Sequence, residues 1–366
     1  MNRAILGLAG WVLISSPTVW AVDTVYYLEP GKKAEITVDG TIEQESPTGV
    51  KLKTKMGVKD IPALQITQIT YTSSVGNIEF RKPFSSETNA FRKGTSASKK
   101  ADFLKTARDG YAELDRKLRG DSKIHRYLQF KIAHTTALLA KDASSRDAAI
   151  TALMEYKAAF SDGWEIVPAL RMLARLQEEK GDAEAASQTY TDLAEVPGIS
   201  ATLKFKNQLR GAQLLLRVNK FADAETKLNQ LAATMSKDDP QRTFVDVYLV
   251  QSQIAQKRYE GVEEKLKAAI RSSEDKNLRA LAHNFLGDYY LLKKDRDRAF
   301  WEYLKVDTTY NQDKEEHAKA LYHLWQLFNS PRNDSLRAAE CLAKLKLKDF
   351  DGTLYQRMAS SETKTP

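Results

Sequence analysis

The sequence has a single cysteine, Cys341, among its 366 residues. One thiol cannot form a disulfide within the chain, so packing alone must hold the fold together. Because Cys341 has apolar neighbours such as Ala338 and Leu342, we expect a buried structural thiol. Apolar residues make up 42% of the chain and charged residues 28%. This composition is typical of a folded soluble protein and excludes both wholesale disorder and a polytopic membrane protein.

Sequence motifs of catalysis are also missing. The chain has no HExxH, no GxSxG, and no glycine-rich motif for phosphates or dinucleotides. His317 and His323 are six residues apart, unlike the four-residue spacing of a helical metal pair. We therefore expect no enzyme activity, no cofactor and no metal site. A hydrolase would require a cleft where two or more acidic residues meet at the junction of the N-terminal and helical parts.

Residues 1–21 have the pattern of a secretory signal. Arg3 precedes an 11-residue apolar run, Ala4–Ile14, and Val19 and Ala21 are small residues at the positions that a signal peptidase recognises. A permanent membrane span needs about 20 apolar residues, so this run is too short for one. The pattern predicts export to the periplasm or cell envelope, with an uncleaved anchor as the alternative.

Residues 22–82 alternate as β-strands do. Lys51, Lys53 and Lys55 are separated by Leu52 and Thr54, which predicts a half-buried strand with a lysine-lined outer face. Turn signals such as Asp39-Gly40 divide the region into about five short strands, which favours a small barrel over a sandwich.

The run Gly40–Tyr71 resembles the small Sm-like or SH3-like barrels at the front of many exported bacterial repeat proteins. Sm-like relatives inside cells bind RNA. Residues 22–82, however, carry eight basic and eight acidic side chains. This balance argues against a nucleic-acid partner.

Residues 83–97 have the composition of a linker, with Pro83, Gly94 and several serines and threonines. Phe84 and Phe91 are the exceptions and could dock the linker on a neighbouring domain. Residues 83–120 contain nine basic and five acidic residues, so much of the net charge of +8 lies here. We interpret this excess as a solvated, like-charged connector.

A small residue recurs at a nearly constant interval through residues 98–350. The intervals between successive copies are 37, 38, 38, 37 and 40 residues, and a large or apolar residue follows four positions later in all but the last copy. The six copies are Ala149, Ala186, Ala224, Val262, Ala299 and Ala339. This spacing predicts about six helical hairpins whose two helices touch at the small residue.

The best copy, Ala282–Val306, resembles a tetratricopeptide repeat through Gly287, Tyr290, Ala299 and Tyr303. The consensus is about 34 residues long, so these copies are longer. His283 also stands where the family has tryptophan. The resemblance implies an α-α superhelix whose inner surface, formed by the first helix of each hairpin, binds a protein partner.

The resemblance places eight residues on this inner groove. They are Arg171, Arg175, Lys206, Gln213, Arg217, Gln251, Asn284 and Asp288. The first members are cationic, which favours an acidic protein or peptide partner. The alternative is that all eight are ordinary solvated side chains.

Together the patterns predict an α+β, mostly α protein. They predict a signal peptide (1–21), a barrel (22–82), a linker (83–97), a tetratricopeptide-like array (98–350) and a tail (351–366). We expect a non-enzymatic scaffold for protein-protein interaction, without nucleic acid and without a stable membrane span after signal cleavage. The alternative is an accessory protein that binds carbohydrate or the cell envelope through the barrel.

Overall fold

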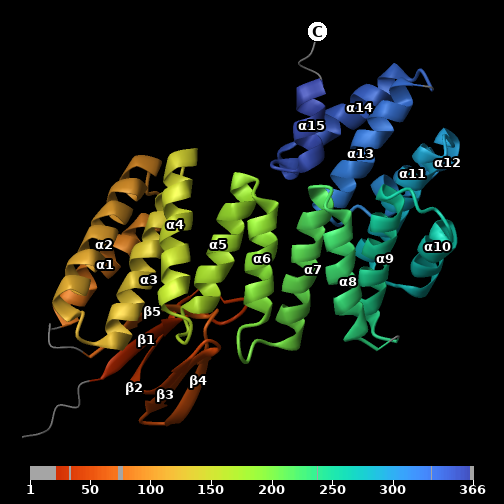
Figure 1. Cartoon of the computed structure of the whole chain (residues 1–366). Helices are drawn as coiled ribbons and strands as arrows, with labels where there is room; N and C mark the ends of the chain where they lie inside the picture. The colour runs from red at the N-terminus through yellow and green to blue at the C-terminus, as the bar shows by residue number, and fades with distance from the viewer. Residues whose placement is uncertain (1–21, 33, 73–76, 237, 331, 363–366) are drawn as a thin grey trace, which may run out of the picture. The chain divides into compact units, whose positions relative to one another are not determined.

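The computed structural model describes residues 22–32, 34–72, 77–236, 238–330 and 332–362, so the predicted signal peptide lies outside the described residues. The chain divides into two compact units, residues 1–172 and 173–366. Five strands come first along the chain and are followed by helices (Figure 1). This order confirms the prediction of an α+β, mostly α fold. Among the described residues, no helix combines the length and apolar character needed to cross a membrane.

The first unit begins with an antiparallel sheet whose strand order is β4-β3-β2-β1-β5. The strands are β1 (Asp23–Tyr27), β2 (Ile36–Ser46), β3 (Gly49–Thr54), β4 (Gly57–Pro62) and β5 (Ile66–Thr70). The first part of β2 pairs with β1 and the rest pairs with β3. The change falls at Gly40, where a Cβ would lie 2.4 Å from the carbonyl oxygen of Lys53. As predicted for β3, Leu52 is buried while Lys51 and Lys53 are exposed.

The strands β4 and β5 are the two edges of this sheet. A turn at residues 63–65 joins them, and no backbone ladder links them among the described strands. Hydrogen bonding therefore shows the five strands of the predicted barrel but not its closure.

The predicted linker, residues 83–97, is wrong over most of its length. Residues up to Ala90 belong to helix α1 (Asn77–Ala90), and α2 (Ala97–Leu118) begins after the capping residue Ser96. The buried positions of α1 include Phe80, Pro83, Glu87 and Ala90, which share one helical face. Two of these four are proline and glutamate, so the apolar period that would have predicted a helix is absent from the sequence.

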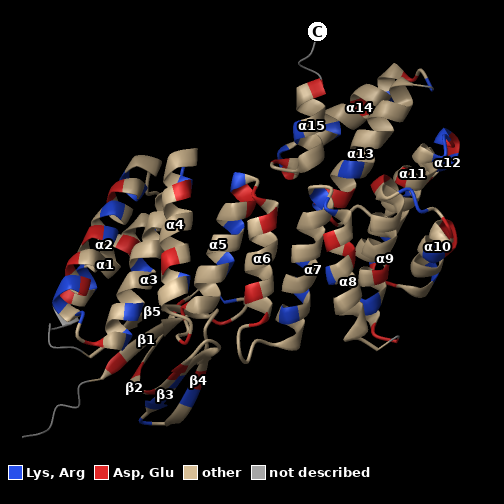
Figure 2. Ribbon diagram, viewed as in Figure 1, with Lys and Arg blue, Asp and Glu red and all other residues tan. Residues whose placement is uncertain are grey.

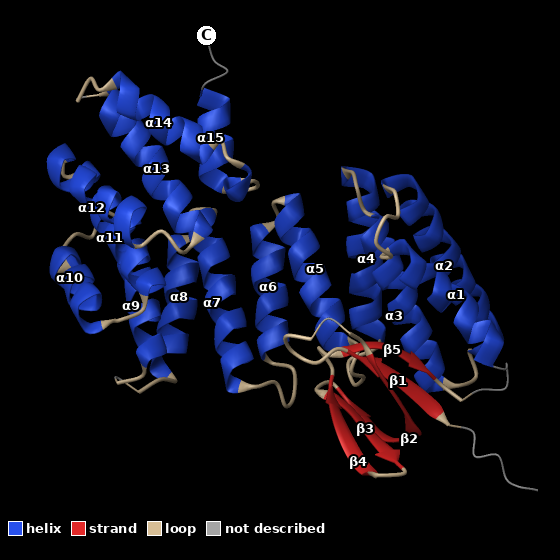
Figure 3. Ribbon diagram, turned by 180° about the vertical axis from the view of Figure 1, so that it is seen from behind, coloured by secondary structure: helices blue, strands red, loops and turns tan. Residues whose placement is uncertain are grey.

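Two more helices complete the first unit, α3 (Ser122–Leu139) and α4 (Ala143–Ala159). The sheet lies at one end of the helices α1 to α4 (Figures 1 and 3). Tyr127 of α3 is fully buried, and its hydroxyl receives a hydrogen bond from the backbone N–H of Ile69 in β5 (3.3 Å). The next helix, α5 (Ile166–Lys180), contains the division between the two units.

The second unit consists of helices that follow one another in pairs. Six of them are capped by the side chain of an aspartate directly before the helix, which satisfies free backbone N–H groups of the first turn. The helices are α6 (Ala183–Ala194), α7 (Ala201–Arg217), α8 (Phe221–Ala233), α9 (Pro240–Ala255), α10 (Val262–Ser272), α11 (Lys276–Leu292), α12 (Arg296–Thr309), α13 (Lys314–Asn329), α14 (Ser335–Leu345) and α15 (Leu354–Glu362).

The recurring small residues are buried as the spacing predicts. Ala149, Ala186, Ala224, Val262 and Ala299 all have 0% exposure. In the best copy, a Cβ on Gly287 of α11 would lie 2.5 Å from the ring of Tyr303 on α12. The two helices therefore touch at a position where only glycine fits.

The last copy is shifted by one residue. Ala339 is exposed, whereas its neighbour Ala338 is only 2% exposed. The marker in α14 is therefore Ala338. The predicted tail, residues 351–366, also contains a helix, because α15 forms there and packs on α13 through Ala359 and Met358.

Candidate binding cleft

A cleft of about 110 Å³ lies among alternate helices of the second unit. Its walls come from α7, α9, α11 and α13, which are the first helices of four successive pairs, and from α15. The lining residues are Gln213, Arg217, Tyr248, Gln251, Leu281, Phe285, Glu315, Glu316, Lys319, Leu354 and Tyr355.

Helical spacing brings the polar residues of this cleft together. Gln213 and Arg217 are one turn apart on α7, and Tyr248 and Gln251 are three residues apart on α9. Arg217 is exposed, and it forms no ion pair within the described part of the chain. Three predicted groove residues, Gln213, Arg217 and Gln251, therefore meet at one cleft.

The opposite wall is formed by a buried lysine. Lys319 is 7% exposed, forms an ion pair with Asp288, and lies 4.9 Å above the ring of Phe285. Burial would lower the pKa of Lys319, but the charge of Asp288 outweighs it and holds that pKa above its ordinary value. The ammonium group therefore stays charged in the wall of the cleft.

Asp288 and Asn284, both predicted to face the groove, are engaged inside the protein. The carboxylate of Asp288 accepts a hydrogen bond from the Tyr303 hydroxyl (2.8 Å) and pairs with Lys319. Asn284 has 0% exposure, and its amide donates to the carbonyl (2.9 Å) and carboxylate (2.7 Å) oxygens of Glu316. The prediction that Asn284 touches a partner is wrong, because it has no free surface.

The other three predicted residues do not line this cleft. Arg175 is exposed and donates to Glu179 one turn away (2.7 Å). Arg171 and Lys206 are exposed as well, and Arg171 belongs to the first unit.

The other eight lining residues were absent from the prediction, among them Tyr248, Lys319 and Tyr355. Tyr248 lies three residues before Gln251, so helical spacing could have indicated it. Lys319 is a charged residue at a buried position of α13, where it pairs with Asp288, and no pattern in the sequence indicates that pairing. Tyr355 belongs to α15, in the segment interpreted as a tail.

The charge of the cleft is mixed rather than purely cationic. Arg217 and Lys319 lie with Glu315 and Glu316. Burial raises the pKa of Glu316, although Lys319 opposes this shift. Figure 2 likewise shows basic and acidic residues interspersed along the helices. Arg217 is the exposed cation of this cleft.

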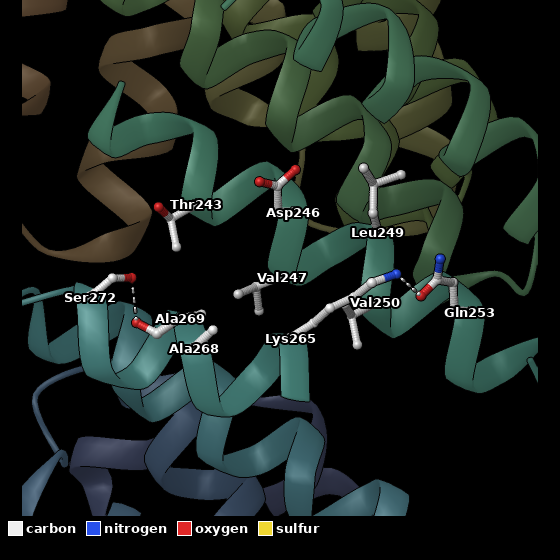
Figure 4. A pocket seen from close by; sticks show the side chains of 10 residues that line it. All are labelled: Thr243, Asp246, Val247, Leu249, Val250, Gln253, Lys265, Ala268, Ala269 and Ser272. Atoms are coloured by element: carbon white, nitrogen blue, oxygen red, sulfur yellow. Dashed lines mark hydrogen bonds between the residues drawn. The ribbon is translucent and has the colours of Figure 1, made fainter. Parts of the chain in front are cut away.

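A second cleft, of about 420 Å³, separates α9 from α10 (Figure 4). Its buried lining residues, Val247, Val250 and Ala269, are apolar. Lys265 donates to Gln253 across it, with 3.3 Å between Nζ and Oε1. Among the described residues that line this cleft, no polar side chain is buried in a position to orient a ligand.

In the first unit, two acidic residues meet beside the sheet. Arg126 of α3 donates to Glu165, just before α5, with 3.1 Å between Nε and Oε2, and pairs with Glu45 of β2. Glu165 is 0% exposed, and the Glu45 side chain is 3% exposed. Glu45 and Glu165 meet near the junction where the hydrolase alternative requires two acidic residues. Both carboxylates are buried away from any substrate, however, and both pair with the guanidinium of Arg126.

Several buried polar atoms around Arg126 have no hydrogen-bond partner among the described residues. They belong to Glu45, Tyr71, Tyr156, Trp164 and Glu165. Burial, partly offset by Arg126, raises the pKa of Glu165 to about 7. Internal water fits this cluster, because several polar groups face one another there.

The histidines of the second unit have structural contacts. His317 shares a hydrogen bond with Asp307 (2.7 Å), and His323 stacks on the ring of Tyr303 at 4.6 Å. Burial lowers the pKa of His323 to about 4, so its ring is neutral at pH 7. Within the described residues, no three metal-binding side chains gather.

The helical pairs resemble tetratricopeptide repeats in fold. A tetratricopeptide repeat protein from Parabacteroides merdae aligns with a TM-score of 0.51 at 14% identity, over 77% of this chain and 98% of that chain. This likeness agrees with the resemblance of Ala282–Val306 to one repeat.

Two further solved structures align with TM-scores below 0.5. The C-terminal part of a TPR repeat-containing protein from Cytophaga hutchinsonii gives 0.41 at 12% identity, over 76% of this chain and 98% of that chain. BtubC from P. vanneervenii aligns with a TM-score of 0.37 at 16% identity, over 64% of this chain and 92% of that chain. No family model and no curated protein matches the sequence.

Proposed function

We propose that the protein is a non-enzymatic scaffold and that its second unit binds an acidic segment of another protein in the cleft around Arg217. The observation that carries this proposal is the meeting of Gln213, Arg217 and Gln251 at one cleft. Their side chains form no hydrogen bond with other described residues. Free carboxamides can pair with a peptide backbone, and a free guanidinium can pair with a carboxylate.

Selection of peptides from a random display library on the full chain tests this function. We expect enrichment of sequences with clustered Asp and Glu. Arg217→Glu should weaken binding of a selected peptide at least tenfold, since it replaces an attraction by a repulsion. Lys206→Glu is the matched control on the same helix, because Lys206 is exposed but does not line the cleft. No acidic enrichment, or equal loss with both variants, would contradict the proposal.

We also propose that the protein is exported to the periplasm or cell envelope after removal of residues 1–21. The apolar run Ala4–Ile14 and the small residues Val19 and Ala21 support this proposal. Sequencing the N-terminus of the protein recovered from a periplasmic extract should give Val22. Cytoplasmic protein that still begins at Met1 would overturn it.

A further inference from the structure

A separate cleft, of about 660 Å³, lies in the first unit between β5 and α1. Three elements contribute to it: β5 with Gln68, α1 with Phe84 and Glu87, and α3 with Lys131. Phe91 and Arg92, in the turn after α1, also line it. This cleft is independent of the function proposed for the second unit.

Its lining includes charged and polar side chains that are almost fully buried. Gln68 is 3% exposed, Glu87 is 7% exposed and Lys131 is 2% exposed. A buried ion is costly unless other groups neutralise it and saturate its hydrogen bonds. These groups differ in how much of their hydrogen-bonding capacity is used within the protein.

Glu87 is satisfied. Its Oε2 accepts from Lys131 Nζ (2.6 Å) and from the Tyr111 hydroxyl (2.6 Å), and its Oε1 lies 3.3 Å from Nδ1 of His134. Burial alone would raise the pKa of Glu87. The charge of Lys131 and the contact with His134 outweigh burial and hold this pKa well below its usual range. The carboxylate is therefore ionised and has little capacity left for a ligand.

The donors of the cleft are not satisfied. Lys131 has three N–H groups, and Glu87 is the hydrogen-bond acceptor found for them among the described residues. The carboxamide of Gln68 has no hydrogen-bond partner in the described part of the chain. Arg92 is exposed and forms no ion pair with a described residue. The exposed Glu35 also lines the cleft, where it accepts a hydrogen bond from the Thr67 hydroxyl. The two acids of the lining balance the charges of Lys131 and Arg92, so the surplus of the cleft is one of hydrogen-bond donors.

Aromatic side chains provide apolar contact beside these donors. Phe84 packs against Tyr26 with 5.1 Å between ring centroids. Phe91 is 53% exposed, and the ammonium of Lys100 lies 4.5 Å from the centre of its ring. A ligand with both a negative group and an apolar face would match this lining.

We propose that this cleft binds a small organic carboxylate, with Lys131 and Gln68 at the floor and Arg92 at the mouth as the groups that hold its oxygens. The partly exposed face of Phe91 contacts the carbon skeleton. Neutral sugars lack the charge that Lys131 and Arg92 would pair with, so they should bind far more weakly.

Isothermal titration of the full chain with succinate, glucuronate and phenylacetate, and with glucose as the neutral probe, tests this site. We expect at least one carboxylate to bind and glucose to bind at least tenfold more weakly. A preference for glucuronate would indicate an acidic saccharide, and a preference for succinate or phenylacetate would indicate a simple organic acid.

Two variants assign the binding to this cleft. Arg92→Gln removes the exposed cation, and Gln68→Met removes the carboxamide at similar volume, so both should fold and bind the carboxylate at least fivefold more weakly. Lys93→Gln is the control, because Lys93 is exposed but does not line the cleft. Lys131→Met is less suitable, since it leaves Glu87 buried without its ion pair. Equal binding of glucose, no binding of any probe, or binding unchanged in both variants would overturn the proposal.

Discussion

The two units join their elements by different physical means. In the first unit, Arg126 holds Glu45 of the sheet and Glu165 before α5 in a buried charged cluster. In the second unit, α11 and α12 meet through the close fit of Gly287 against the ring of Tyr303. We call the Arg126 cluster the charged joint and the contact of Gly287 with Tyr303 the packed joint. The charged joint should fail when one charged side chain is removed, whereas the packed joint should respond to small changes of side-chain volume. The comparison therefore predicts different sensitivities to mutation, pH and side-chain size.

The largest effect should come from Arg126→Met. Removing the guanidinium leaves Glu45 and Glu165 buried without a cation, which should lower the free energy of unfolding by about 3–5 kcal/mol. Urea denaturation of the full chain measures this loss.

Arg119→Met is the control for this variant. The Arg119 side chain is 67% exposed and lies 3.6 Å from Asp115, so its removal should cost less than about 1 kcal/mol. Equal effects of the two substitutions would show that the buried cluster has no special role.

The same cluster should make stability depend on pH. Burial raises the pKa of Glu165 from 4.5 to about 7, so the folded state holds a proton that the unfolded state releases. Below pH 4.5 Glu165 is protonated in both the folded and the unfolded state, so it does not lower the free energy of unfolding. As pH rises towards 7, the free energy of unfolding falls by roughly 1–3 kcal/mol, because the unfolded state loses this proton first. Glu165→Gln should flatten the curve of unfolding free energy between these pH values. Parallel curves for wild type and variant would rule out this assignment.

Gly287→Ala should weaken the packed joint of the second unit. The new Cβ would lie 2.5 Å from the buried ring of Tyr303, which cannot move freely, so we expect a loss of about 1–3 kcal/mol. Thermal unfolding measures it. Gly120→Ala is the control, because its Cβ would have no neighbour within 4 Å. A neutral Gly287→Ala would contradict the close contact.

The smallest expected effect comes from a comparison of two of the recurring small residues, Ala299 and Ala339. Ala299→Leu should cost about 1–3 kcal/mol, because Ala299 has no exposed surface. Ala339→Leu should change stability by less than about 0.5 kcal/mol, because Ala339 is exposed. Ala338→Leu should again be costly. If Ala339→Leu were as harmful as Ala299→Leu, the shift of one residue in α14 would be wrong.

The sequence could predict the packed joints but not the charged one. Ala186, Ala224 and Val262 recur at an interval of 38 residues because each hairpin repeats the same local contact. Arg126 and Glu45 are separated by 81 residues, and no period links them. Pairings of this kind depend on how the sheet packs on the helices, which local spacing does not encode.

The residues of the candidate cleft also divide into those that the sequence could predict and those that it could not. Gln213, Arg217 and Gln251 follow from the position of helices in a repeat, and all three line the cleft. Asn284 occupies an equivalent helix, but its hydrogen bonds to Glu316 withdraw it from the surface. Helix α1 escaped prediction because Pro83 and Glu87 occupy buried positions that are normally apolar.

A charge exchange at Arg217 tests the central claim most directly. An acidic peptide selected on the wild-type chain should bind at least tenfold more weakly to Arg217→Glu. A peptide in which the contacting Asp or Glu is replaced by Lys should recover binding to Arg217→Glu and lose it to wild type, as measured by fluorescence anisotropy. If no single replacement in the peptide restores binding, Arg217 does not contact the partner and the proposed cleft is not the binding site.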